Sequence, residues 1–432
     1  MTGKFTETLA EFASGTLSTT LLSQSIGRLS ALDWLACGLA GIDEPVAKIL
    51  RSMAAAEAGV QSACMFGGGA GPPRMAALVN GTISHALDYD DTHFAHIGHP
   101  SVAVYSAAFA MGQHLNCTLP QVLEAALMGM ELSVRVGLWL GRDHYQSGFH
   151  QTATAGAFGA GVAAGRLAEF NATQMAQVLG LTATRAAGLK AQFGTMGKPY
   201  NAGLAASNGV EVAQLIQAGF EANSEALEGE FGFGATHHGS ANIKDALAGL
   251  GKVWMFENVS HKFHACCHGL HAALEAAREL DLAAPEIAEL QVRTHPRWMT
   301  VCNQTAPNTG LGAKFSYRTV LAMQALGLDT AGLRNYSDET CGRSDLQALR
   351  DRIHVKADNS LSETEAVVNL LRRDGLRRES RHDLQSVVDL DIRKNRVLDK
   401  AASLIGNNRS EIAWAMLHEN VSCSAFSELF GS

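Results

Sequence analysis

Apolar side chains recur at the spacing of a helix with one buried face from about residue 5 to about residue 265. A clear example runs through Ile26, Leu29, Leu32, Leu35 and Leu39. The pattern predicts further helices at 101–114, 119–139, 151–168, 174–190 and 203–220. Most of this region is therefore predicted to be helical.

Cap candidates and small residues refine this prediction. Asn171 and Thr173 stand where one helix is expected to begin, and such side chains accept hydrogen bonds from the first free backbone N–H groups. Alanine and glycine are frequent on the helix faces, and small residues let helix axes approach closely. We therefore expect a compact bundle in which Gly156, Gly159 and Gly161 mark close crossings.

The pattern changes after about residue 285. Alternating and β-branched residues predict strands at 290–294, 352–356 and 366–373. The dipeptide Asp374-Gly375 follows the last of these and is a strong hairpin signal, so another strand should follow. A helix is predicted at 314–326, and helical spacing returns in the last forty residues.

This order of elements predicts a mainly α fold with two domains. A chain of 432 residues exceeds the usual size of one hydrophobic core. We expect a large all-helical domain at residues 1–265, joined by the C-terminal helices of 395–432. A smaller α+β domain is expected at residues 266–394.

Composition and charge exclude several classes of protein. Hydrophobic residues make up 47% and charged residues 18%, as in globular proteins. A net charge of −8, without a basic stripe interleaved with aromatics, argues against nucleic-acid binding. No secretion signal or membrane-length apolar stretch is found, so we predict a cytoplasmic protein. The eight cysteines form no CxxC pair and are expected to be reduced, without structural zinc.

The densest polar cluster is HALDYDDTHFAHIGHP, residues 85–100, with three aspartates and four histidines. One hypothesis is a metal site, because His93, His96 and His99 repeat every third residue. Pro100 disfavours the helix that would keep these imidazoles on one face. The favoured hypothesis is a metal-free acid–base loop, in which a histidine moves protons while aspartate and threonine hold substrate or water.

Two further segments offer candidates for a site. In RDHYQSGFHQTATAGAFGAG, residues 142–161, Tyr145 and His150 precede a helix of small residues, where each is a candidate proton donor or an ordinary packing or capping residue. In GTMGKPYNAG, residues 194–203, Met196 and Lys198 lie in a predicted glycine-rich loop ahead of a helix. Free backbone N–H groups at such a position favour anions, which predicts a carboxylate cradle, with a solvated lysine as the alternative.

A last candidate precedes two adjacent cysteines near the predicted domain junction. In SHKFHACCHGLHAALEAA, residues 260–277, Lys262 comes before Cys266 and Cys267. The cysteines are interpreted as small buried residues rather than nucleophiles.

In their order along the chain, these segments resemble the MmgE/PrpD family. The matching pieces are HALDYDDTH…GHPS, GFH…GAFGAG, GTMGKPYNAGLAA, LEGEFGF at 227–233, HKFHACC…H, and AKFS at 313–316. The resemblance spans nearly the whole chain. It implies a helical domain, an α+β lid domain, a homodimer, and neither a metal nor an organic cofactor. By motif it implies these pocket residues: Asp88, Thr92, His99, His150, Lys198 and Lys262.

The family includes 2-methylcitrate dehydratase, cis-aconitate decarboxylase and iminodisuccinate epimerase, which bind carboxylates and move a proton on carbon. The chain most resembles the epimerase, because it is short for the family, lacks the longer tail of the dehydratases, and has KFHACC where a KPYPCC-like segment is expected. We expect a cofactor-independent epimerase of a small polycarboxylate, iminodisuccinate, with Lys198, His99, Tyr145 and His150 as acid–base candidates. Asp88, Thr92, Lys262 and Met196 would bind the substrate. A dehydratase or decarboxylase is the alternative.

Overall fold

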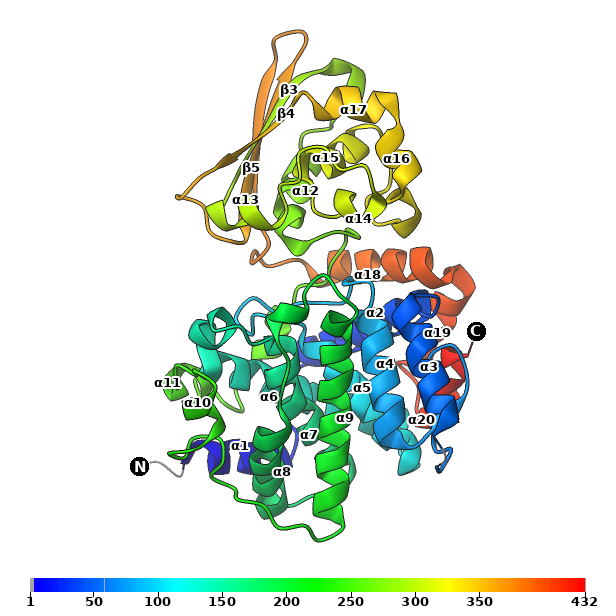
Figure 1. The fold of residues 1–432 in the computed structure, drawn as a ribbon, viewed down its shortest axis with the longest axis vertical. Coiled ribbons are helices and arrows are strands. Elements are labelled where there is room, and N and C mark those ends of the chain that lie inside the picture. The colour runs from blue at the N-terminus through cyan, green and yellow to red at the C-terminus, as the bar shows by residue number, and fades with distance from the viewer. Residues whose placement is uncertain (1–3, 58, 432) are drawn as a thin grey trace. The chain divides into compact units, whose positions relative to one another are not determined.

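Long helices build most of the N-terminal part of the chain, as the helical spacing predicts (Figure 1). The computed structural model describes residues 4–57 and 59–431, whose contacts form two units: Met1–His261 with Val397–Ser432, and Lys262–Arg396. The long helices of the first unit are α1 (Lys4–Ser14), α2 (Leu21–Ala40), α3 (Pro45–Ala56), α4 (Pro73–His85), α5 (Pro100–His114), α6 (Leu119–Gln146), α7 (Gln151–Leu167), α8 (Ala172–Arg185) and α9 (Gly197–Gln217).

Shorter elements complete the first unit. They are the strands β1 (Ala63–Cys64) and β2 (Ala70–Gly71) and the helices α10 (Phe233–Thr236), α11 (Ile243–Ala246), α19 (Asn407–Met416) and α20 (Cys423–Ser427). Helix α18 (Leu390–Ile405) begins in the second unit and ends in the first. The region after Gln217 is mostly irregular, so the predicted helical region ends earlier than residue 265.

The core of the first unit is organised around α7. All of its residues except Arg166 are buried, and it packs against α5, α6 and α9 (Figure 1). A helix that is apolar on every side is a buried helix. The small residues of α7 therefore set the distance to its neighbours.

One crossing, between α6 and α7, requires glycine on both helices. A Cβ added at Gly159 would lie 2.5 Å from the carbonyl oxygen of Gly129, and one added at Gly129 would lie 2.5 Å from the carbonyl oxygen of Gly159. These separations are too short for any real Cβ. The prediction that Gly159 marks a close crossing is confirmed.

Local signals placed some helix starts correctly but not all helix ends. Asn171 caps α8, because its side chain accepts from the backbone N–H of Gln174. The helix predicted at 174–190 ends at Arg185, since Gly188 adopts a φ of 140° and its carbonyl accepts from the backbone N–H of His150. The helix predicted at 203–220 begins earlier, at Gly197.

The second unit contains a four-stranded sheet in the order β4-β3-β5-β6. Its strands are β3 (Ile287–Thr294), β4 (Ile353–Ala357), β5 (Glu365–Arg372) and β6 (Arg377–Asp383). β3 pairs with β4 in parallel and with β5 antiparallel, and β5 pairs antiparallel with β6. The strand predictions and the Asp374-Gly375 hairpin are confirmed.

Helices α12 (His271–Arg278) and α15 (Tyr317–Ala325) pack on one face of this sheet (Figure 1). The other helices of the unit are α13 (Pro296–Val301), α14 (Gly310–Ala313), α16 (Asp338–Gly342) and α17 (Ser344–Arg350). The helix predicted at 314–326 begins only at Tyr317, because the side chain of Ser316 caps it by accepting from the backbone N–H of Thr319.

The predicted fold class, mainly α with a smaller α+β part, is confirmed. The division into domains at 1–265 with 395–432 and at 266–394 stays a prediction, because a compact unit is not by itself an independently folding domain. Within residues 4–57 and 59–431, no helix is both long and apolar enough to span a bilayer.

The glycine crossing yields a stability prediction. Gly159→Ala should lower the free energy of unfolding by about 1–3 kcal/mol, because the new methyl overpacks the contact with α6. Gly156→Ala is the matched control on the same helix, since its Cβ would meet Ala103 Cβ at 3.3 Å. Thermal and denaturant unfolding measure both. Equal stability of the two variants would contradict the crossing described.

Candidate active site

The segment between α4 and α5 carries the predicted acid–base loop. His85 is the last residue of α4, and His99 is the N-cap of α5 with Pro100 at the first helical position. Asp88 and Ile97 adopt positive φ angles of 52° and 56°, which turn the chain back between the two helices. The segment thus brings His99 close to His85.

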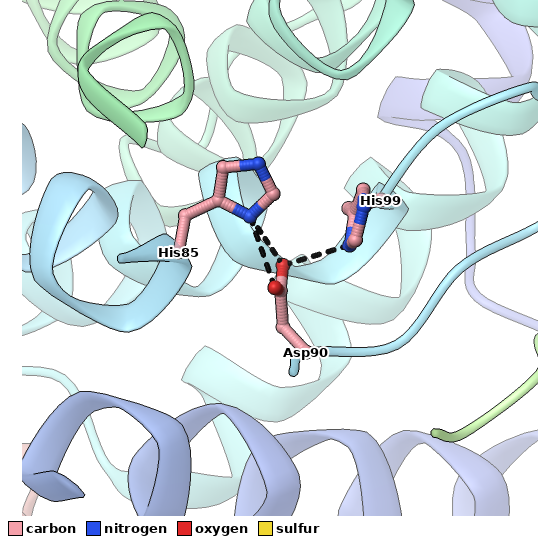
Figure 2. Close-up of side chains that lie close together, drawn as sticks. All are labelled: His85, Asp90 and His99. Carbon is pink, nitrogen blue, oxygen red and sulfur yellow. Dashed lines mark hydrogen bonds and ion pairs between the residues drawn. The ribbon is translucent and has the colours of Figure 1, made fainter. Parts of the chain in front are cut away.

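Asp90 lies between these two histidines (Figure 2). Both of its carboxylate oxygens are 2.9 Å from Nδ1 of His85, and its Oδ2 is 3.1 Å from Nδ1 of His99. The two imidazole rings meet edge to face with centroids 4.5 Å apart. The carboxylate of Asp90 therefore contacts both imidazoles, in each case at Nδ1.

The protonation states follow from burial. Burial alone would raise the pKa of Asp90, but the imidazoles of His85 and His99 hold it well below its usual range. Burial lowers the pKa of His85 to about 4, although Asp90 acts in the opposite direction. At neutral pH a neutral His85 therefore donates its Nδ1–H to an ionised Asp90.

A cation and a second carboxylate lie beside His99. Nζ of Lys198 donates to Oδ1 of Asp88 at 2.7 Å, and the same oxygen is 3.4 Å from Nε2 of His99. The side chain of Asp88 is 39% exposed, whereas that of Lys198 is 18% exposed. The structure thus brings together three predicted site residues, Asp88, His99 and Lys198.

His150 joins the same cluster as the N-cap of α7. Its ring lies 6.0 Å from that of His85, centroid to centroid, at an interplanar angle of 25°. Burial, reinforced by the charge of Lys198, holds the pKa of His150 well below its ordinary value. Nδ1 of this neutral imidazole is 3.2 Å from Nδ2 of Asn201 on α9.

The structure corrects the surroundings predicted for Lys198. This residue lies in the first turn of α9 and not in a loop ahead of the helix. The backbone N–H groups there are already engaged: those of Gly197 and Lys198 donate to the side chain and carbonyl of Thr195, that of Tyr200 donates to Met196, and Pro199 has none. The predicted cradle of free N–H groups is wrong, and the ammonium of Lys198 instead pairs with the carboxylate of Asp88.

The other sequence candidates have different surroundings. The ring of Tyr145 is covered by Lys190, whose Nζ is 3.8 Å from the ring centroid. Thr92 is paired through its backbone with Ser260. Met196 is the N-cap of α9 and is 49% exposed, and Lys262 is the first residue of the second unit. A role in the site stays a prediction for Tyr145, Thr92, Met196 and Lys262.

The alternative metal site on every third histidine is not formed. His93 Nε2 bonds to the carbonyl of Met255 at 2.9 Å, while His96 Nε2 bonds to Ser133 Oγ at 3.0 Å. In the described part of the chain, the His, Cys, Asp and Glu side chains with three ligand atoms close enough for one ion are His85, Asp90 and His99. The hydrogen bonds of His85 to Asp90 and the 3.1 Å contact of His99 with Asp90 describe this arrangement, and a metal-free site stays a prediction.

A buried lysine on a C-terminal helix bonds to the backbone of the loop between α4 and α5. Nζ of Lys400 on α18 donates to the backbone carbonyl of Tyr89 at 2.6 Å and lies 2.5 Å from Oδ1 of Asp33 on α2. Both side chains are almost completely buried. The position of the acid–base loop therefore depends on helices at both ends of the sequence.

Asp91 is a further buried acid of the loop. Its Oδ2 accepts from Ser101 Oγ at 2.6 Å, but burial raises its pKa to about 7 and the nearby carboxylate of Asp33 adds to this shift. Its protonation therefore changes near neutral pH.

Sequence reasoning missed His85, Asp90, Asn201 and Lys400 as parts of the site. His85 and Asp90 belong to the polar segment already singled out, and Asn201 stands three residues after Lys198, on the same face of a helix. These spacings were available signals. Nothing near Lys400 in the sequence indicates its distant partner Asp33.

The family follows from comparison with known proteins. Residues 7–246 match the MmgE/PrpD N-terminal domain, and residues 264–419 match the MmgE/PrpD C-terminal domain. Together these matches cover most of the chain. The protein belongs to the MmgE/PrpD family.

Several curated relatives are named cis-aconitate decarboxylase. A cis-aconitate decarboxylase of Aspergillus terreus (strain NIH 2624 / FGSC A1156) is 29% identical over 297 residues, which are 65% of this chain and 60% of the relative. A cis-aconitate decarboxylase of Homo sapiens is 32% identical over 174 residues, 38% of this chain and 35% of the relative. The chain thus spans about 60% of the length of the Aspergillus relative and less of the human one.

Lys400→Met is expected to lower the free energy of unfolding by about 3–5 kcal/mol, because it leaves Asp33 as an uncompensated buried charge. Lys48→Met, an exposed position on α3, is the control and should have almost no effect. The double variant Asp33→Leu with Lys400→Met should recover much of the loss, since both charges are removed. Denaturant unfolding measures all three. A small loss in the single variant would show that the pair does not anchor the loop.

Asp91 predicts a pH dependence of stability. Its pKa in the folded state is about 7 and lies near 3.9 in an unfolded chain. The folded state therefore holds an extra proton between these values, and stability falls as pH rises through the window. The unfolding free energy of the wild type minus that of Asp91→Asn should fall by up to about 1.4 kcal/mol per pH unit between pH 4 and 7. For the exposed control Asp43→Asn, the corresponding difference should not change with pH. A difference for Asp91→Asn that does not change with pH would contradict the raised pKa of Asp91.

Proposed function

We propose that this protein is an enzyme that removes and returns a proton at the carbon next to a carboxylate of a small polycarboxylate. The observation that carries the proposal is the contact of His99, Lys198 and their two carboxylates. His99 faces ionised Asp90 through Nδ1, and its Nε2 lies beside the Lys198–Asp88 pair. A proton-transfer group thus stands next to a cation that binds carboxylates.

His99 is the proposed acid–base residue. With Nδ1 directed at Asp90, the ring keeps one orientation, and Nε2 is the nitrogen left to exchange a proton with substrate. Asp90 also stabilises the imidazolium that forms when His99 accepts a proton. A positioned group of this kind contributes typically about 10²–10⁴-fold to a rate.

Lys198 is the proposed carboxylate-binding residue. When a proton leaves the carbon next to a carboxylate, negative charge builds on the carboxylate oxygens, and a fixed cation stabilises that charge. Lys198 is held by Asp88, whose side chain is partly exposed, so a substrate carboxylate can take the place of Asp88 at the ammonium. On sequence grounds, Lys262, Thr92 and Met196 are proposed as further substrate contacts, and Tyr145 as an additional acid–base candidate besides His99 and His150.

His150 is the proposed second proton-transfer group. It is buried and neutral in the same cluster, with its ring close to that of His85. Return of a proton to carbon from a group other than the one that removed it needs two such groups. His99 and His150 supply them.

Two specific reactions fit this chemistry. Epimerisation of iminodisuccinate is favoured by the segment KFHACC at 262–267. The presence of two proposed proton-transfer groups, His99 and His150, also favours it, since an epimerase removes a proton from one face of the carbon and delivers one to the other. Decarboxylation of cis-aconitate is favoured by the names of the relatives. In this reaction a C–C bond breaks, carbon dioxide leaves, and the electron pair that remains on carbon takes up one proton from an acid–base group, so only the proton-delivery step is shared with the epimerase. The homodimer implied by the family resemblance and the cytoplasmic location predicted from the sequence both stay predictions.

The test follows iminodisuccinate, cis-aconitate and 2-methylcitrate by NMR in deuterium oxide with chelator-treated protein. Deuterium at Cα of iminodisuccinate with interconversion of stereoisomers identifies the epimerase, whereas carbon dioxide release from cis-aconitate identifies the decarboxylase. His99→Gln should lower the active rate by about 10²–10⁴-fold. His114→Gln, at the opposite end of the same helix, is the matched control and should leave it unchanged.

Each outcome decides part of the proposal. Proton exchange that survives His99→Gln would reject His99 as the acid–base residue. Inert iminodisuccinate, cis-aconitate and 2-methylcitrate would reject the proposed reaction class. Activity that is lost on chelation and restored by a divalent metal would reject the metal-free site.

A further inference from the structure

We propose that Asn201 is a positioning residue that holds neutral His150 with its proton on Nε2. No sequence motif assigns this role. The inference rests on the proposed function only where it describes His150 as a proton donor, because the tautomer itself follows from hydrogen-bond geometry.

The amide of Asn201 can be oriented without reference to the histidine. Its Nδ2 lies 3.2 Å from the backbone carbonyl oxygen of Leu189, a group that only accepts hydrogen bonds. The atom at this position must therefore be the amide nitrogen and not the amide oxygen. Asn201 is 5% exposed, so water does not offer an easy substitute for this bond.

The same nitrogen then determines the tautomer of His150. The second N–H of the amide is directed at Nδ1 of His150, 3.2 Å away. An amide NH2 has no lone pair to offer a ring N–H, so Nδ1 must be the acceptor. A neutral imidazole with an accepting Nδ1 carries its proton on Nε2.

The opposite arrangement holds at Asp90. A carboxylate only accepts, so His85 donates to it from Nδ1, and Nε2 is the unprotonated nitrogen of His85 when it is neutral. Nδ1 of His99 lies 3.1 Å from the same carboxylate, while its Nε2 lies 3.4 Å from Oδ1 of Asp88. Asp90 and Asn201 therefore set opposite tautomers on histidines of one cluster. In the proposed function, His99 accepts a proton at Nε2 once substrate has replaced Asp88, and His150 donates one from Nε2.

Helix α9 supplies both the cation and the amide of this arrangement. Lys198 and Asn201 are three residues apart in its first turns and lie on the same face. Lys198 contacts Asp88, and Asn201 contacts His150. A single short helical segment thus positions a carboxylate-binding group and the tautomer of a proton donor.

The direct test is nitrogen NMR of protein labelled with 15N-histidine, without substrate. The signals of His150 are identified by their loss in His150→Gln. In the wild type, Nε2 of His150 should carry the proton and Nδ1 should be unprotonated. A wild-type His150 with its proton on Nδ1, or with both nitrogens protonated at neutral pH, would overturn the proposal.

Variants of two asparagines on α9 separate positioning from packing. Asn201→Asp places an acceptor at Nδ1, so the proton of His150 should move to Nδ1. Asn208→Asp is the matched control, because Asn208 is equally buried on the same helix and also donates to a backbone carbonyl, that of Arg185 at 2.7 Å. It should leave the signals of His150 unchanged. An unchanged tautomer in folded Asn201→Asp would also overturn the proposal.

Steady-state kinetics provide the second readout on whichever substrate is turned over. Asn201→Asp should lower kcat by about a hundredfold or more with little change in KM, because substrate still binds while the donor presents the wrong nitrogen. Asn208→Asp should retain kcat. If the wild type turns over no substrate tested, the proposed function fails, while the NMR result still decides the role of Asn201.

Discussion

A buried, ionised carboxylate must be paired with polar groups, and the pairing of Asp90 determines where the imidazoles of the site lie. Its two oxygens face Nδ1 of His85 and Nδ1 of His99, which come from the end of one helix and the start of the next. Leaving such a charge unpaired would cost several kcal/mol. The loop between α4 and α5 therefore folds back so that both imidazoles reach Asp90.

The surrounding helices keep this arrangement rigid. Close glycine contacts bring α6 against α7, and α7 begins at His150. The first turns of α9 present Lys198 and Asn201, and Lys400 holds the loop from the opposite end of the chain. Packing alone brings these helices together, but buried polar bonds select the orientation of each side chain. Chemistry at the site thus depends on contacts that are far apart in sequence.

The parts of the fold that depend on neighbouring residues could be predicted from the sequence. The cap at Asn171, the hairpin at Asp374-Gly375 and the buried helix with Gly159 each follow from residues within a few positions. The predicted end of the helix after Asn171 was wrong, since Gly188 leaves the helix to bond with His150. That bond joins two segments distant in sequence, which no local pattern reports.

The site was predicted in part for the same reason. Asp88, His99 and Lys198 stand in motifs that mark acid–base and anion-binding chemistry, and the structure brings them into contact. The prediction of a cradle of free backbone N–H groups near Lys198 was wrong, because these N–H groups already donate to Thr195 and Met196. Asn201 and Lys400 were missed, because the role of an amide or an ammonium depends on the atom that it contacts, and these contacts join residues that are distant in the sequence.

Neutron diffraction from crystals of the substrate-free protein locates protons on individual ring nitrogens and therefore reads the tautomers of His85, His99 and His150. We expect a proton on Nδ1 of His85 and of His99, and on Nε2 but not Nδ1 of His150. A proton on Nδ1 of His150, or a protonated Asp90 beside histidines that lack a proton on Nδ1, would contradict it.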